Sequence, residues 1–413
     1  MGNIFDGVNV NKLNGNLGNI APSDENEAIL IYVVPNGDLP AGVAYNTSCE
    51  LLQPQDAIDL GFTAAHDANN NFYCLGTIQE FFDYNPNGVL HLIPVASGDT
   101  ISEILALASV KAAIRTASKA KGIAIANSAE TAVDLENEVE PVQAVIAAFA
   151  AEHRLIDFIL LQGNNGTGGD VWAYGDLPDL RAKNAPNVCI SIGQDPYVAV
   201  QDAAYRKQAD IGTVLGNIMV RNVSENLGSV QIVSPPDAYK ANPNYTLTRG
   251  NRWKAAQLAN GIKMETLSPT VQTAISNKGY IFAGKYEGYD GLFFNDSPTC
   301  VAATSDYSSV ENNRTWNKAA RLIRLALLPK VKGKVKKDPA TGFIKSTTIG
   351  NWVGLCNKAL NTMVTADEIS GFSVNIPSNQ IPNASTPVVV KASIVKDGIV
   401  FEFSVDLGLV NNI

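Results

Sequence analysis

The chain has 413 residues, a net charge of −9 and a hydrophobic content of 46%. This length exceeds what one simple core organises, so two or three domains are expected. The acidic balance argues against a nucleic-acid-binding protein. Only 17% of the residues are charged, against roughly 25% in typical domains. Two interpretations stay open: a large enzyme with a surface rich in Asn, Ser and Thr, or a protein whose surface is covered by partners.

Scattered cysteines and the first residues indicate where the protein folds. The five cysteines form no C-x-x-C pair, which is typical of reduced, buried thiols and of folding in the cytosol. The first residues, MGNIFDGVNV, contain no basic region followed by an apolar one, so no signal peptide is expected. No apolar run approaches the roughly 20 residues that a membrane helix needs, and no membrane insertion is expected.

Residues 1–28 are rich in Asn and Gly and have few bulky apolar side chains. Such a segment cannot form a core of its own. It is therefore expected to be an extended arm or, as an alternative, to be disordered.

Residues 29–240 are expected to form an α/β domain, because strands alternate with helices along them. Continuous apolar runs predict buried strands at 28–35, 89–95, 121–127, 155–163 and 187–194. Helices are predicted at 53–62, 77–84, 101–122, 138–153 and 210–223. The stretch 234–245 is dense in Pro and Asn and is the predicted linker.

The part after the linker, 241–386, combines short strands with helices, so the fold class is α/β with an α+β C-terminal part. Strands broken by glycine turns are expected at 279–296, and helices at 312–328 and 347–366. The first of these helices is amphipathic. Its apolar face is formed by Trp316, Ala320, Ile323 and Leu327, and its basic stripe by Arg314, Lys318 and Arg321.

Basic residues dominate 314–345, where Asp338 is the only acid. The predicted basic patch consists of Arg314, Lys318, Arg321, Arg324, Lys330, Lys332, Lys334, Lys336 and Lys337. An acidic stretch, 130–140, lies in the first half. Opposite charges on two parts suit head-to-tail assembly of identical copies, although two solvated faces that never meet would have the same sequence. Because the one aromatic residue of 314–337, Trp316, fits the apolar helix face, a docking face for an acidic partner is preferred over a nucleic-acid site.

A hairpin is predicted at the end of the sequence, in 387–413. Residues 387–395 lead through Lys396, Asp397 and Gly398 into 399–409. The face shared by alternate residues of the second strand contains Ile399, Phe401, Phe403, Val405 and Leu407. A lone hairpin is only marginally stable, so it is expected to join a larger sheet. That sheet is the chain's own, which the pattern favours, or a neighbour's.

No motif for catalysis, a cofactor or a metal ion stands out. The Gly-rich loop 160–170 lacks the Lys-Ser/Thr ending of a phosphate-binding loop and does not match G-x-G-x-x-G, so a surface loop is expected. The histidines His66, His91 and His153 lack metal-ligand spacing. There is no G-x-S-x-G, and the acidic stretch 130–140 lacks the spacing of a calcium loop.

Several segments, in chain order, resemble contractile tail sheath proteins. TIQEFFDYNPNGVLHLIPVA (77–96) resembles a sheath pattern in which a helix ending in Phe-Phe and an Asn-Pro-Asn-Gly turn lead into an apolar strand. DIGTVLGNIMVRNVSENLGSV (210–230) is similar to a later sheath helix and its turn. Four later segments resemble the common sheath core. They are a strand pair at 279–294, SSVENNRTWNKAARLIRLALLP, ISGFSVNI and IVFEFSVDL. The resemblance covers about residues 28–409 and extends to sheath-like proteins of phages, prophages and related contractile injection systems.

This resemblance implies a structural subunit with no active site and no cofactor. Such subunits form stacked hexameric rings around an inner tube, and their contraction drives the tube through a target envelope. The implied partners are further copies of the chain, the inner tail tube protein, and the baseplate and tail terminator proteins, with no nucleic acid. The implied location is a virion tail or a contractile injection particle that is assembled in the bacterial cytoplasm.

The resemblance also implies a layout. The α/β domain lies outside, the sheath core domain 241–386 faces the tube, and the arms 1–28 and 399–413 add strands to the sheets of neighbours. The arm residues implied in these contacts are Ile4, Phe5, Val8, Val10, Ile399, Phe401, Phe403, Val405 and Leu407. The basic patch would face the tube or another subunit.

The chain departs from the best-known sheaths in its compact outer domain and its short C-terminal tail. The pairing of the arms, the contraction state and the host machine (phage, tailocin or extracellular injection system) therefore stay open. Two other classes of function stay open as well. One is an α/β enzyme with a site near 163–170, and the other is a non-contractile virion structural protein.

Overall fold

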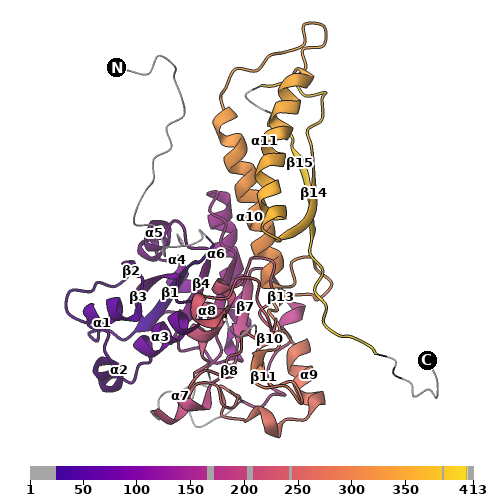
Figure 1. The fold of residues 1–413 in the computed structure, drawn as a ribbon. Helices are drawn as coiled ribbons and strands as arrows, with labels where there is room; N and C mark the ends of the chain where they lie inside the picture. Colours follow the sequence, from indigo (N-terminus) through magenta and orange to yellow (C-terminus); the bar gives the residue numbers. More distant parts are fainter. Residues whose placement is uncertain are drawn as a thin grey trace, which may run out of the picture.

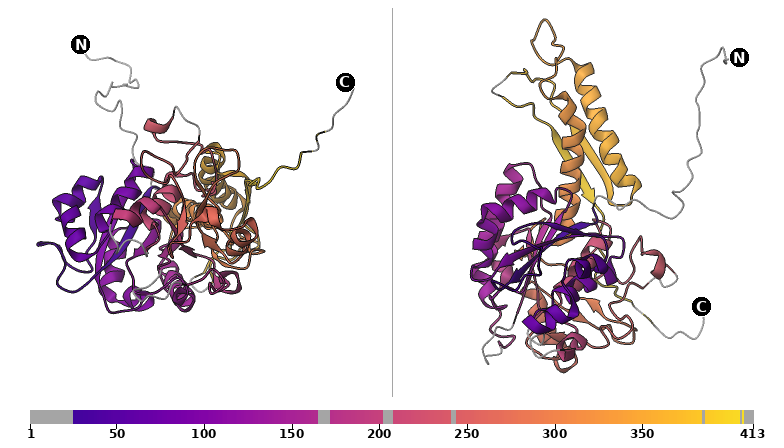
Figure 2. Two further views of the ribbon diagram at one scale, coloured as in Figure 1. Left: turned by 90° about the horizontal axis from the view of Figure 1, so that it is seen from below. Right: turned by 90° about the vertical axis from the view of Figure 1, so that its left-hand side faces the viewer.

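The computed structural model describes residues 25–164, 172–201, 208–240, 244–383, 386–405 and 407. Residues 25–309 form an α/β body, and residues 310–396 form an elongated C-terminal extension that projects from one side of it (Figure 1). A second view shows the two long helices of the extension side by side and largely clear of the body (Figure 2). In the part of the chain that is described, no helix is long and apolar enough to cross a membrane.

A seven-stranded sheet forms the centre of the body, in the order β10-β7-β5-β4-β1-β3-β2. Its strands are β1 (Glu27–Val34), β2 (Cys49–Leu51), β3 (Val89–Ala96), β4 (Gly122–Ala126), β5 (Phe158–Gln162), β7 (Val188–Ser191) and β10 (Tyr280–Ile281). Neighbours pair in parallel except β2 and β3, which are antiparallel. Parallel sheets are buried on both faces, which explains the continuous apolar runs. The five strands predicted in the first half are confirmed.

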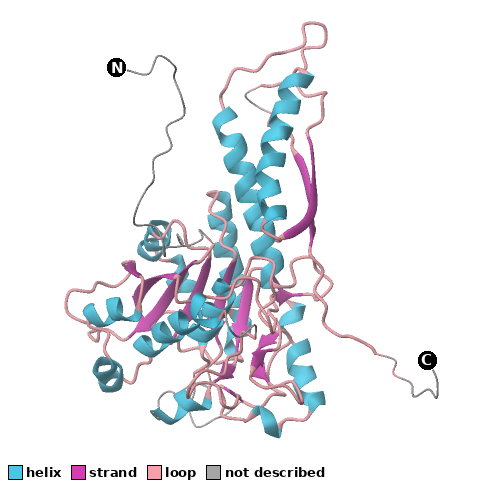
Figure 3. Cartoon of the chain, viewed as in Figure 1, coloured by secondary structure: helices cyan, strands magenta, loops and turns pink. Residues whose placement is uncertain are grey.

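Helices flank this sheet (Figure 3). They are α1 (Pro54–Asp59), α2 (Ala64–Asn70), α3 (Cys74–Tyr84), α4 (Ile101–Ala106), α5 (Ala108–Thr116), α6 (Val139–Ala151), α7 (Pro196–Gln201), α8 (Ile211–Val220) and α9 (Pro269–Asn277). Helix α8 packs against α3 and contacts β1, β4 and β5, whereas α5 contacts β3 and α6 contacts β7. The result is the mixed α/β architecture that the alternating pattern predicts.

One predicted helix is wrong in its length. The segment 101–122 forms two short helices, because the backbone of Leu107 is extended (φ −57°, ψ 130°) and ends α4 where α5 begins. No Gly or Pro marks this break in the sequence. Helix α4 packs against α6 and α5 against β3, so tertiary packing decides the break.

The predicted linker at 234–245 does not separate two cores. Tyr245 and Leu247 belong to the same hydrophobic cluster as the central sheet. The Tyr84 hydroxyl at the end of α3 donates to the Leu247 carbonyl at 2.6 Å, and β10 adds an edge strand to the sheet. Residues on both sides of 240 therefore form one body, and the predicted division there is corrected. The density of Pro and Asn reflects a loop that packs against α3.

Short strand pairs complete the body. They are β6 (Asn184–Ala185) with β13 (Cys300–Val301), β8 (Gly193–Gln194) with β9 (Gln257–Leu258), and β11 (Ala283–Gly284) with β12 (Phe293–Phe294). The last pair confirms the strands expected in 279–296.

The extension consists of α10 (Val310–Leu327), α11 (Ser346–Thr365), β14 (Ile369–Asn375) and β15 (Lys391–Lys396). Both predicted helices are confirmed. The predicted hairpin is wrong for the described residues: β15 pairs antiparallel with β14, which precedes it, and residues 399–405 form no strand. In this pairing Phe372 lies opposite Ile394, and both pack on the apolar cluster of α10 and α11. Alternation of apolar and polar side chains along a strand does not show which other strand it pairs with.

The close approach of α8 to α3 depends on glycine. A Cβ atom on Gly212 would lie 2.1 Å from the Thr77 carbonyl oxygen, and one on Gly216 would lie 2.6 Å from that of Phe81. These two residues are one helical turn apart, so α8 presents a smooth strip along which the backbone of α3 lies.

We expect Gly212→Ala to lower the free energy of unfolding by about 1–3 kcal/mol, because the added methyl group forces α8 away from α3. Gly354→Ala is the matched control in α11, where a Cβ would meet no atom within 4 Å. That change should raise the free energy of unfolding by about 0.5–1 kcal/mol. Urea denaturation followed by circular dichroism measures both, and similar effects at the two positions would contradict the packing argument.

Candidate functional site

Helix α10 joins the extension to the body, and its two halves have different surroundings. The buried residues of the first half are Val310, Glu311, Asn313, Arg314, Thr315, Asn317 and Ala319. The second half, from Ala320 to Leu327, is half-buried or exposed and lies beside α11 (Figure 1). Since buried polar side chains need partners, the contacts of the first half show how the extension is held.

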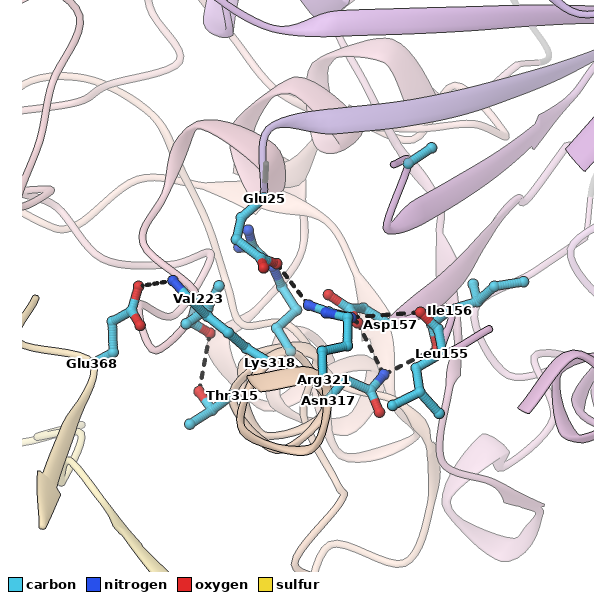
Figure 4. Close-up of polar contacts among 12 residues, drawn as sticks. Glu25, Leu155, Ile156, Asp157, Val223, Thr315, Asn317, Lys318, Arg321 and Glu368 are labelled. Atoms are coloured by element: carbon cyan, nitrogen blue, oxygen red, sulfur yellow. Dashed lines mark hydrogen bonds and ion pairs between the residues drawn. The ribbon is translucent and has the colours of Figure 1, made fainter. Parts of the chain in front are cut away.

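Amide side chains of α10 bind the amino-end edge of the sheet. Asn313 Nδ2 donates to the Pro186 carbonyl at 2.7 Å, just before β7. Asn317 Nδ2 donates to the Ile156 carbonyl at 3.2 Å and to the carboxylate of Asp157 at 2.9 Å, just before β5 (Figure 4). These bonds fix the first half of the helix against two central strands.

Arg314 binds the C-terminal end of α8. Its Nη1 donates to the carbonyls of Ile218 (2.7 Å), Arg221 (3.3 Å) and Asn222 (3.5 Å). The residue is 1% exposed, and burial lowers the pKa of Arg314. The partial negative charge at a helix C-terminus stabilises a buried guanidinium in this place.

Arg321 bridges two carboxylates that are far apart in the sequence. Its Nη1 donates to Asp157 Oδ1 and its Nη2 to Glu25 Oε2, both at 2.7 Å (Figure 4). The Asp157 side chain is fully buried, and those of Arg321 and Glu25 are 18% and 15% exposed. Burial lowers the pKa of Arg321, but the two carboxylates more than offset it, so the pKa of Arg321 is raised and the group stays charged.

Lys318 binds the turn that leads into β14. Its Nζ pairs with Glu368, the residue directly before β14 (Figure 4). Burial raises the pKa of Glu368, and Lys318 opposes that effect. The face of α10 formed by Asn313, Arg314, Asn317, Lys318 and Arg321, named here the polar face, thus contacts the body and β14.

The predicted basic patch therefore divides in two. Three of its members, Arg314, Lys318 and Arg321, make contacts inside the chain. The members that are exposed are Arg324, Lys330, Lys332, Lys334, Lys336 and Lys337. Helical spacing separates charged from apolar side chains, but it does not show whether the charged face meets water or buried acceptors.

Part of the predicted acidic stretch 130–140 also acts within the chain. The Ile101 amide donates to Glu130 Oε1 at 3.2 Å, and the Ser102 amide donates to Glu138 Oε2 at 2.7 Å. Both amides belong to the first turn of α4, where carboxylates satisfy free N–H groups and the helix dipole.

A groove of about 960 Å³ lies between α10 and β15. Trp316, Ala320 and Ile323 line it from the helix, and Ala392 and Ile394 from the strand. Trp316 is 45% exposed. Strand β15 pairs with β14 on one side and, in the described chain, with no strand on the other. Polar side chains, among them Asn312, Arg324 and Lys396, line the groove as well. The groove therefore combines apolar and polar side chains with an open strand edge.

The segment after β15 is apolar and exposed. Among the predicted arm residues, Phe401, Phe403, Val405 and Leu407 are 75%, 82%, 78% and 92% exposed, and Ile399 is half-buried. The described residues of this segment lead away from the extension without forming a helix or a strand (Figure 1). The arm residues predicted near the start, Ile4, Phe5, Val8 and Val10, lie outside the described residues.

The other candidate sites are a second cavity, groups of possible metal ligands and the Gly-rich loop. A cavity of about 320 Å³ is lined by Glu27, Glu50, His91 and Lys119, with His91 Nε2 3.5 Å from Glu27. No three His, Cys, Asp or Glu side chains in the described ranges converge as metal ligands would. Most of the Gly-rich loop 163–170 lies outside those ranges.

Models of one family match nearly the whole chain. A model described as DUF2586, N-terminal domain, matches residues 5–298, and one described as DUF2586, C-terminal domain, matches residues 306–413. The two matches meet where the body ends and α10 begins. No curated protein shows a match to this chain.

Solved structures share the fold. A chain in the cryo-EM structure of the anti-feeding prophage baseplate, 6-fold symmetrised, is 13% identical, with a TM-score of 0.58 over 97% of this chain and 99% of that chain. A chain of the same baseplate in the contracted state is 11% identical, with a TM-score of 0.51 over 98% of each. The sheath tail protein Lin1278 from Listeria innocua is 8% identical, with a TM-score of 0.49 over 89% of this chain and 94% of that one. The first two likenesses show that this chain shares its fold with chains of the anti-feeding prophage baseplate.

We expect Arg314→Leu to lower the free energy of unfolding by about 3 kcal/mol, because several buried carbonyl groups lose their donor. Arg324→Leu removes an exposed arginine from the same helix and should change it by no more than about 0.5 kcal/mol. Thermal and urea unfolding of the two variants test this. Equal effects would mean that the contacts of Arg314 with α8 contribute little.

Proposed function

Since the chain belongs to the DUF2586 family and has the fold of a component of a contractile injection particle, we propose that it is a structural subunit of a contractile tail sheath. Copies form stacked hexameric rings around an inner tail tube. Contraction of the rings drives the tube through a target envelope, with the baseplate and the tail terminator at the two ends. The subunit itself carries no active site.

The proposal rests on two features that occur in the same chain, an open groove and an exposed apolar segment. Within the described residues, the groove is lined by α10 and by β15, whose second edge pairs with no strand there. The segment 399–407 offers alternating apolar side chains that are exposed. An extended segment that adds to an open edge gains main-chain hydrogen bonds, and its alternate side chains fill the groove. Each copy is thus a donor and an acceptor of a strand, as a polymer requires.

Contraction is favoured over a static particle by the anti-feeding prophage chains. Related chains occur in a 6-fold symmetrised baseplate and in the same baseplate in the contracted state. A fold that persists in a contracted particle suits a subunit that keeps its neighbours while it moves. A non-contractile structural protein would form a single lattice and never a shorter, wider one.

The purified protein should form striated hollow tubes of uniform width in negative-stain electron microscopy. Two variants test the strand exchange. Deletion of 399–413 removes the donor, and Ala320→Arg places a charged side chain in the acceptor groove. Each should abolish tubes. Ala320→Arg should leave the melting temperature of the monomer within about 4 °C of the wild type, because Ala320 is only half-buried.

Mixing the two variants sharpens the test. The truncated copy keeps its groove and the Ala320→Arg copy keeps its segment, so the mixture should form a one-to-one complex but no tube. Asn357→Arg, on the exposed surface of α11, is the control and should still assemble. Tubes from either single variant would exclude this donor and acceptor, and a wild-type protein that stays monomeric under all salt conditions would exclude the sheath proposal.

A further inference from the structure

The first described residues are bound to different parts of the molecule. Glu25 pairs with α10 through Arg321 at 2.7 Å. The Asn26 side chain accepts a hydrogen bond from Asn85 Nδ2 at 2.6 Å, and Glu27 begins β1. This stretch, 25–27, is named here the arm root. It is anchored to the body and, through the ion pair of Glu25 with Arg321, to the extension.

The arm root and the groove use different sides of the same helix. Asn317 and Arg321 are one turn apart on the side that contacts Asp157 and Glu25. The neighbouring residue Ala320 lines the groove, and one residue step turns the helix by about 100°. Because α10 is one continuous helix of 18 residues, a rotation that moves Arg321 also moves the wall of the groove.

We propose that Arg321 is a positioning residue that couples the arm root to the groove through α10. The proposal rests on the sheath function, because it concerns the groove that a second copy of this chain would fill. With Glu25 bound, α10 keeps the orientation in which the groove beside β15 is open. When Glu25 is released, the half-buried second half of α10 is free to shift, and the groove binds a neighbour's strand less well.

The chemistry of the junction suits this coupling. A guanidinium group can bind two carboxylates with separate nitrogen atoms, which a lysine ammonium does with less geometric control. The buried Asp157 fixes one nitrogen of Arg321, and the second is left for Glu25. Glu25 is the more exposed of the two carboxylates, so it can leave without exposing the buried charge. Coupling of this kind acts in both directions: a strand in the groove also strengthens the hold on the arm root.

The coupling can be measured in the monomer by hydrogen exchange. Glu25→Gln leaves the Asp157–Arg321 pair intact, and should accelerate amide exchange in residues 319–327 about tenfold by loosening the second half of α10. Glu152→Gln is the matched control, because it breaks an ion pair of the same length, with Arg115, on the body. It should leave exchange in 319–327 unchanged. Unchanged exchange in the Glu25→Gln variant overturns the proposal, whether or not the protein forms tubes.

Assembly gives the second measurement. Glu25→Gln and Arg321→Lys should each raise the protein concentration needed for tube formation about tenfold, while Glu152→Gln should not. Because Arg321→Lys already weakens the contact that Glu25→Gln removes, the double variant should need no higher concentration than Arg321→Lys alone. Additive effects, or normal assembly of Glu25→Gln, overturn the coupling although tubes still form. Faster exchange in 319–327 together with a wild type that forms no tubes would instead keep the coupling and reject the sheath function.

Discussion

A single buried carboxylate, that of Asp157, fixes how the extension leaves the body. It is fully buried at the amino end of β5, where an ionised group without a partner would be strongly destabilising. Arg321 supplies the opposite charge and Asn317 a hydrogen bond, and both come from one face of α10. The first half of the helix cannot slide or turn about its axis without separating Asp157 from these partners. The direction in which the extension leaves the body follows from this contact.

The extension is incomplete as a sheet. Its two strands, β14 and β15, would be marginal alone, and they are stabilised by packing on α10 and α11. Natural proteins usually protect an open strand edge with charges, bulges or a covering element. In the described part of the chain no strand pairs with the open side of β15, which borders Ala320 and Ile323 together with the charged Arg324 and Lys396. An open edge beside apolar side chains fits a site that another chain completes.

The elements of this fold were more predictable than their contacts. The central strands could be predicted because parallel strands buried on both faces must be apolar throughout, and α10 because its faces differ in polarity. The burial of its basic face could not, since its partners Asp157 and Glu25 lie in segments far from α10 in the sequence. The neighbour of β15 was also out of reach, because alternation within 391–396 fits a partner strand on either side. Sequence patterns record which side chains share a face, and tertiary packing decides what that face meets.

One buried cluster in the body has the composition of an active site. Arg252 pairs with Glu80 of α3 and lies 3.4 Å from Asp195, and burial, reinforced by Glu80, raises the pKa of the nearby Asp210. Yet Asp195 accepts hydrogen bonds from main-chain amides, including that of Trp253 at 2.9 Å. Neither of the two cavities described above is lined by these residues. These charged groups hold a loop against α3 and stabilise the body, whereas the groove and the exposed apolar segment lie on the extension.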